Sequence, residues 1–93
     1  MTNTKNALEG YIKDFGKVCK VSNIISQVCQ LRGYDWLEKE LLNRWGKTVL
    51  NNQDEDAEVA FILAKWDFIK YLENYFMKDE PIIVFLIDAI KYI

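Results

Sequence analysis

The pattern of apolar and polar residues predicts one long amphipathic helix in the second half of the chain. Between about residues 52 and 77, apolar residues recur with the three- and four-residue steps of one helix face. The members of this face are Ala57, Ala60, Phe61, Ala64, Phe68, Leu72, Tyr75 and Phe76. A second apolar row runs beside it: Val59, Leu63, Trp66 and Ile69. Other elements are expected to cover so wide an apolar surface, which predicts that this helix is the central one of a bundle.

Shorter helices are predicted before it. The first runs from about Thr4 to Phe15 and the second from about Ser22 to Leu31, although the two could instead form one long bent helix. Gly33 suits the left-handed position that follows a helix end. A third, short helix is expected to be capped by Asp35 and to end at Gly46.

The last apolar run, Ile82–Ile93, predicts a final helix. Its β-branched residues would also suit a strand, but a single strand has no visible partner. Pro81 is expected in the first turn of this helix, where its missing N–H costs nothing. The run has 12 residues, whereas about 20 are needed to span a bilayer. The sequence therefore predicts an all-α fold, a single domain over residues 1–93 with four to five helices.

A dense run of acids lies at the start of the predicted long helix. Lys47–Asn51 is expected to be a loop and Asn52 to cap the helix, which places the acids of residues 54–58 in its first turn. There, negative charge complements the exposed N–H groups and the helix dipole, which alone explains these residue types. The same acids would also form an anionic patch for a basic partner surface. Glu38 and Glu40 of the preceding helix could extend that patch.

Composition argues against several classes of function. The chain has a net charge of −2, two cysteines and no histidine. Without histidine there is no imidazole to activate a nucleophile and no His-rich metal site, and the four scattered glycines do not form a phosphate-binding loop. Cys19 and Cys29 lack the C-x-x-C spacing of zinc sites and are expected to be two buried thiols. We therefore expect a protein that is not an enzyme and that holds no cofactor or metal.

These features favour a cytoplasmic protein that binds another protein, since the N-terminus has no apolar segment of a signal peptide. Exposed Tyr and Trp are frequent anchors of interfaces. The pattern favours a small inhibitor, of the immunity-protein or phage-encoded type, that occludes a larger and locally basic protein such as a nuclease. No membrane partner is expected. The predicted contact residues are Tyr34, Trp36, Glu38, Glu40, Asp54, Glu55, Asp56 and Glu58.

Two alternatives remain open at this stage. Residues 22–45 have the outline of a helix-turn-helix, and residues 1–32 carry five Lys/Arg against two acids, which suits a nucleic-acid-binding regulator. However, Asp35, Glu38 and Glu40 on the second helix of that unit would repel phosphates, so nucleic acid is not the expected partner. The other alternative is a structural subunit that forms a homodimer through Ile82–Ile93.

Overall fold

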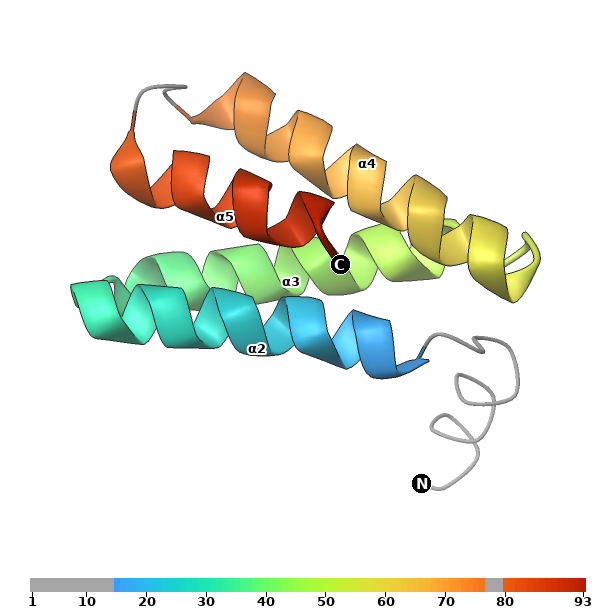
Figure 1. The fold of residues 1–93 in the computed structure, drawn as a ribbon, viewed down its shortest axis with the longest axis horizontal. Coiled ribbons are helices and arrows are strands. Elements are labelled where there is room, and N and C mark those ends of the chain that lie inside the picture. Colours follow the sequence, from blue (N-terminus) through green and yellow to red (C-terminus); the bar gives the residue numbers. More distant parts are fainter. Residues whose placement is uncertain (1–14, 77–79) are drawn as a thin grey trace.

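The computed structural model describes residues 15–76 and 80–93, which form four α-helices and no strand. The helices are α2 (Phe15–Arg32), α3 (Asp35–Asn51), α4 (Ala57–Tyr75) and α5 (Pro81–Lys91). Consecutive helices run in opposite directions, and the main contacts join α2 to α3, α3 to α4, α4 to α5 and α5 back to α2 (Figure 1). The predicted all-α bundle is confirmed, and the apolar run near the C-terminus is a helix. No helix in the described ranges has the length and apolar character needed to cross a membrane.

The turn between α2 and α3 is built on Gly33, which has a φ of 74°. The N–H groups of Gly33 and Tyr34 donate to the carbonyls of Gln30 and Cys29, at 3.2 and 2.8 Å, so the end of α2 is hydrogen-bonded as a left-handed glycine permits. α2 begins at Phe15, earlier than the predicted Ser22. The predicted helix from Thr4 lies, apart from Phe15, outside the described residues.

α3 is longer than predicted and does not end at Gly46. Its buried side chains continue through Trp45 to Thr48 and Val49, and this packing offsets the cost of about 1 kcal/mol for a glycine inside a helix. The predicted loop over Lys47–Asn51 is therefore wrong. Asp35 is the first helical residue rather than the cap, since the N-cap position belongs to Tyr34.

The boundaries of α4 differ from the predicted 52–77. Asn52 is the C-cap of α3, where its side-chain Nδ2 donates to the carbonyl of Thr48 at 2.8 Å, and it does not begin the next helix. α4 starts at Ala57, after Asp56 in the N-cap position, and ends at Tyr75. In α5, Pro81 occupies the first turn as predicted.

The core lies between the four helices and is almost wholly apolar. Its buried members are Val21, Ile25, Cys29, Leu37, Leu41, Trp45, Val49, Phe61, Ala64, Phe68, Ile69, Leu72, Ile82, Ile83, Leu86 and Ile90. Most of the first predicted row of α4 is buried, but Tyr75 in its last turn is exposed.

Apolar residues of two helices are exposed, and the cover predicted for the second row of α4 is wrong for three of its four members. Leu31 is 85% exposed, because the buried side of α2 follows Val21, Ile25 and Cys29 at four-residue steps. In the second row of α4, Ile69 is buried but the other three members are exposed, because α3 and α5 pack against only one side of α4.

Candidate protein-binding surface

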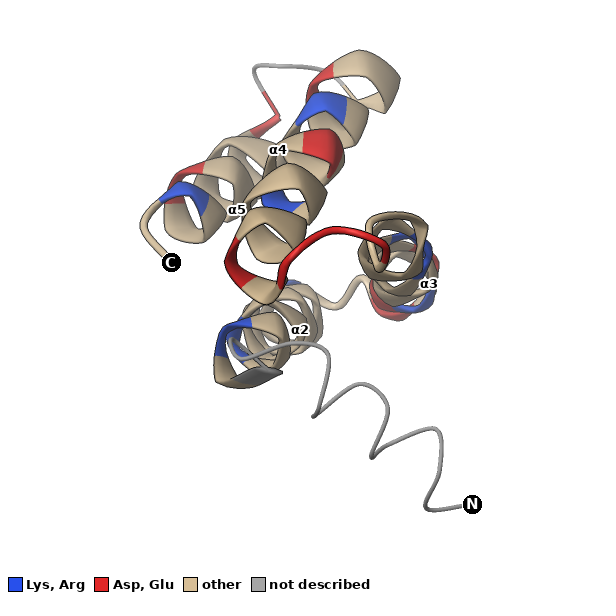
Figure 2. Cartoon of the chain, turned by 90° about the vertical axis from the view of Figure 1, so that its right-hand side faces the viewer, with Lys and Arg blue, Asp and Glu red and all other residues tan. Residues whose placement is uncertain are grey.

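The acids that precede α4 lie in an exposed connection between α3 and α4. Asp54 and Glu55 belong to the turn, Asp56 is the N-cap of α4 and Glu58 lies in its first turn. We call these four residues the acidic loop, which Figure 2 shows as a red arc that joins the two helices. The backbone carries the hydrogen bonds here: the carbonyl of Asp56 accepts from the N–H of Ala60 at 2.6 Å.

The carboxylates of the acidic loop are not used to cap the helix. The Asp56 side chain makes no capping hydrogen bond, and within residues 15–76 and 80–93 no side-chain hydrogen bond or ion pair engages any of the four. All four residues are exposed. Interaction with the helix dipole remains, but capping hydrogen bonds do not account for these acids, which stay available to cations from outside.

Glu38 and Glu40 do not join the acidic loop. They lie near the start of α3, and the eleven residue steps from Glu40 to Asn51 correspond to about 16 Å of helix. Glu38 is half-buried and accepts a hydrogen bond from Gln30 Nε2 at 3.3 Å, whereas Glu40 is exposed. The predicted extension of one acidic patch along α3 is therefore not formed.

The two predicted aromatic anchors share the end of the bundle where Glu38 and Glu40 lie. Tyr34 is half-buried and packs against the core, while Trp36, two residues later, is 64% exposed. The structure thus divides the eight predicted contact residues into two groups of four, one at each end of α3. Only Trp36 in the first group presents a large apolar surface to solvent.

Exposed apolar side chains flank the acidic loop on both sides. Leu50, in the last turn of α3, is 52% exposed. Val59, which follows Glu58 in α4, is 43% exposed. Sequence reasoning missed Leu50 because it was assigned to a loop, and it placed Val59 among covered residues. Apolar contacts next to a charged rim are typical of protein interfaces.

The two cysteines differ in their surroundings. Cys29 is buried, and its pKa is raised by burial and, to a smaller extent, by the nearby charge of Glu38. Cys19 is exposed, so the prediction of two buried thiols is wrong for this residue. Cys19 and Cys29 are ten residues apart on α2, about 15 Å along the helix. This distance is too long for a disulfide within one chain.

A polar hollow that sequence reasoning missed lies between α3 and α4. Its walls are Glu40, Asn43, Arg44, Lys47, Tyr71 and Tyr75. The Arg44 guanidinium carbon lies 4.5 Å from the centre of the Tyr71 ring, a cation–π contact. Burial raises the pKa of Tyr71, as do Glu40 and Tyr75, while Arg44 acts in the opposite direction. The charged side chains of the hollow are thus one acid, Glu40, and two cations, Arg44 and Lys47.

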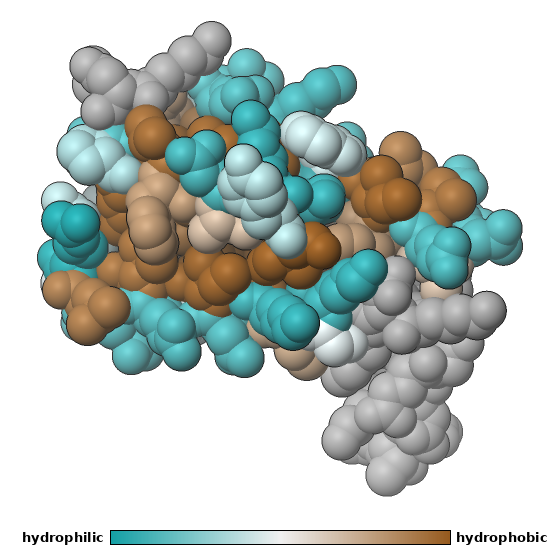
Figure 3. All heavy atoms as spheres, viewed as in Figure 1, coloured by the Kyte–Doolittle hydropathy of each residue, from teal (hydrophilic) through white to brown (hydrophobic). Residues whose placement is uncertain are grey.

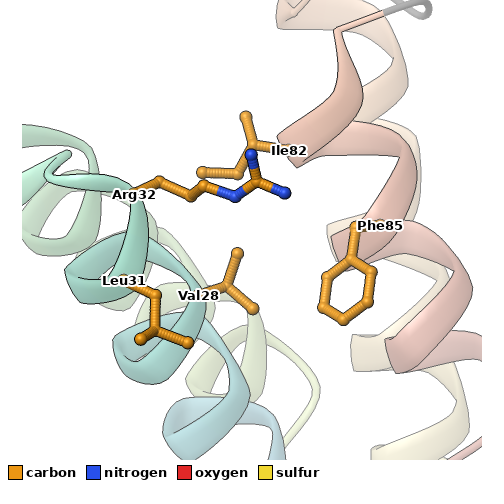
Figure 4. Close-up of a pocket in the computed structure, with 5 residues that line it drawn as sticks. All are labelled: Val28, Leu31, Arg32, Ile82 and Phe85. Carbon is orange, nitrogen blue, oxygen red and sulfur yellow. The ribbon is translucent and has the colours of Figure 1, made fainter.

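An apolar pocket lies between the end of α2 and the start of α5. It is lined by Val28, Leu31, Arg32, Ile82 and Phe85 (Figure 4). The Arg32 side chain extends across the pocket toward Ile82, opposite Val28 and Phe85 (Figure 4). The volume of the pocket, about 130 Å³, suits one side chain. Pockets that bind small-molecule ligands usually begin at roughly 300 Å³.

No group of three His, Cys, Asp or Glu residues in the described part of the chain is placed to hold a metal ion. Comparison with protein-family models, curated protein sequences and solved structures found no match to this chain.

Proposed function

We propose that the chain is a small protein-binding inhibitor whose acidic loop docks on a basic surface of a larger protein. The observation that carries the proposal is the combination of four exposed, unengaged carboxylates with the exposed apolar side chains of Leu50 and Val59 beside them. Carboxylates that capping hydrogen bonds do not use, and that lie next to apolar contact area, support a role in binding.

The two kinds of side chain would contribute differently to the complex. The acidic loop would raise the association rate by attracting a basic surface over distances of about one Debye length, roughly 8–10 Å in physiological salt. Leu50 and Val59 would supply contact area that leaves water on binding, at about 25 cal/mol per Å² of apolar surface. We infer that charge sets the choice of partner and that apolar contact sets the lifetime of the complex.

The class of partner follows from the charge of the acidic loop. Proteins that handle nucleic acids carry basic surfaces because they bind phosphates, and an anionic protein can occlude such a surface. A nuclease or another nucleic-acid-handling enzyme is therefore the proposed target, and the chain would act as an immunity protein or a phage-encoded inhibitor. The inhibitor itself would need no catalytic group, because it works by covering the active surface of its target.

Capture from lysate of the native host tests the proposal. The bait is compared with Asp54→Lys/Glu55→Lys, which changes two turn residues outside the helices, and with Glu40→Lys/Asp88→Lys, which changes net charge equally at exposed sites elsewhere. A basic protein retained by the wild type and by the second variant, but lost from the first, would support the acidic loop as the docking site. Equal retention by all three baits would show that the loop is not the site.

A further inference from the structure

The outer side of α4 carries four exposed apolar residues in helical spacing. Val59, Ile62, Leu63 and Trp66 are 39–50% exposed and follow the i, i+3, i+4, i+7 steps of one helix stripe. We call them the outer row. Figure 3 shows hydrophobic surface over the N-terminal part of α4.

The N-terminal half of α4 is apolar on two opposite sides. Ala60, Phe61 and Ala64 face the core, while the outer row faces away from it. A helix that is apolar all round is normally covered all round, and a continuous exposed stripe of this kind indicates an interaction surface. Within the described residues, α3 and α5 cover only the core side.

We propose that a second copy of the chain covers the outer row, in an antiparallel pairing of the two α4 helices. In a twofold interface, residue i of one copy meets residue j of the other, and j meets i. A pairing centred between Ile62 and Leu63 sets Ile62 against Leu63 and Val59 against Trp66. Every member of the outer row then meets an apolar residue of the other copy.

The charged residues that flank the outer row fit the same register. Glu58 of one copy comes beside Lys65 of the other, and the turn that holds Glu55 comes near Lys70, so acids at the start of one α4 lie near lysines of the other. Glu55, Glu58 and Lys70 are exposed. Lys65 is half-buried, and its Nζ also donates to the carbonyl of Lys91 in its own chain at 3.4 Å. A parallel pairing would instead set Glu58 against Glu58. This complementarity favours a second copy in antiparallel register as the occupant.

The dimer does not depend on the proposed inhibitor function, although Glu55, Glu58 and Val59 belong to both surfaces. A partner on the acidic loop would therefore compete with the second copy for these three residues. An inhibitor that is monomeric in solution and still captures its partner through the loop would overturn the dimer and leave the proposed function intact.

Sedimentation equilibrium of the full chain, from about 1 μM to 1 mM, tests the pairing over the range in which small interfaces associate. We expect a concentration-dependent dimer. Ile62→Lys should weaken dimerisation at least about tenfold, because it places a charge at the centre of the outer row. Phe85→Lys, an equally exposed site on α5, is the matched control and should dimerise as the wild type does.

A charge exchange tests the register and does not depend on the apolar variants. Glu55→Lys alone and Lys70→Glu alone should each weaken the dimer, because each sets like charges against one another. The double variant Glu55→Lys/Lys70→Glu should restore it. A monomer at all concentrations, equal effects of Ile62→Lys and Phe85→Lys, or no recovery in the double variant would overturn the proposal.

Discussion

The indole N–H of Trp45 donates a hydrogen bond to the backbone carbonyl of Val18, 3.2 Å away, and so joins α3 to α2 across 27 residues of sequence. The Trp45 ring also meets two aromatic rings of α4 edge-on, Phe61 at 6.3 Å and Phe68 at 5.5 Å between ring centres. One buried side chain of α3 therefore contacts two other helices, α2 and α4.

Trp45→Phe should lower the free energy of unfolding by about 1–3 kcal/mol, because it removes one hydrogen bond and leaves part of the indole volume unfilled. Trp36→Phe is the matched control. Trp36 is 64% exposed, so its substitution should change stability by less than about 0.5 kcal/mol. Urea unfolding followed by circular dichroism measures both. Equal effects of the two substitutions would show that Trp45 does not hold the helices together.

Two glycines should respond to alanine in opposite directions. Gly33 has a φ of 74°, where a Cβ is strained, so Gly33→Ala should destabilise the fold by about 1 kcal/mol. Gly46 lies inside α3 with open space around it, so Gly46→Ala should stabilise the fold by roughly 0.5–1 kcal/mol. Thermal unfolding gives both values. A loss of stability in Gly46→Ala would contradict a continuous α3.

The two thiols should react at very different rates. Cys19 is exposed, whereas Cys29 is buried and has a raised pKa, which lowers the fraction of reactive thiolate. We expect one equivalent of thiol to react rapidly with a disulfide reagent under native conditions and two equivalents in denaturant. Cys19→Ala should abolish the rapid phase. Rapid reaction of both thiols in the native protein would contradict the burial of Cys29.

Stability should fall at alkaline pH in part because of Cys29. Burial raises the pKa of its thiol in the folded state above that of an unfolded thiol, so the native state holds this proton more tightly than the unfolded state does. The resulting stabilisation is complete below the pKa of an unfolded thiol, about 8.5, and is lost as pH rises through the native pKa. Denaturant unfolding between about pH 8 and pH 10 should therefore show a shallower decline for Cys29→Ala than for Cys19→Ala. Equal slopes would contradict the raised pKa.

Local sequence signals predicted the helical nature of the fold better than its boundaries. The periodicity of residues 57–72 and the positions of Gly33 and Pro81 act within a few neighbouring residues, and the structure confirms each of them. The helix boundaries predicted at Gly46 and Asn52 are wrong because the packing of Thr48 and Val49 extends α3 beyond the glycine. Asn52 therefore caps the C-terminus of α3 and does not begin the next helix.

The candidate surface was only partly predictable for a related reason. The acids of residues 54–58 are adjacent in sequence and remain together in space, so their cluster could be predicted. The distance of Glu40 from that cluster depends on the continuation of α3 to Asn51, which the sequence did not indicate. The exposure of Val59 and Trp66 depends on which side of α4 the other helices cover, and periodicity alone does not determine that.

The association rate of the captured partner, measured as a function of ionic strength, is the most direct test of docking through the acidic loop. We expect the rate constant to fall steeply as salt rises. Asp54→Lys/Glu55→Lys should lower the rate constant at low salt and flatten its salt dependence, and Glu40→Lys/Asp88→Lys should have a much smaller effect on both. A rate that does not change with salt, or equal behaviour of the two variants, would contradict docking through the acidic loop.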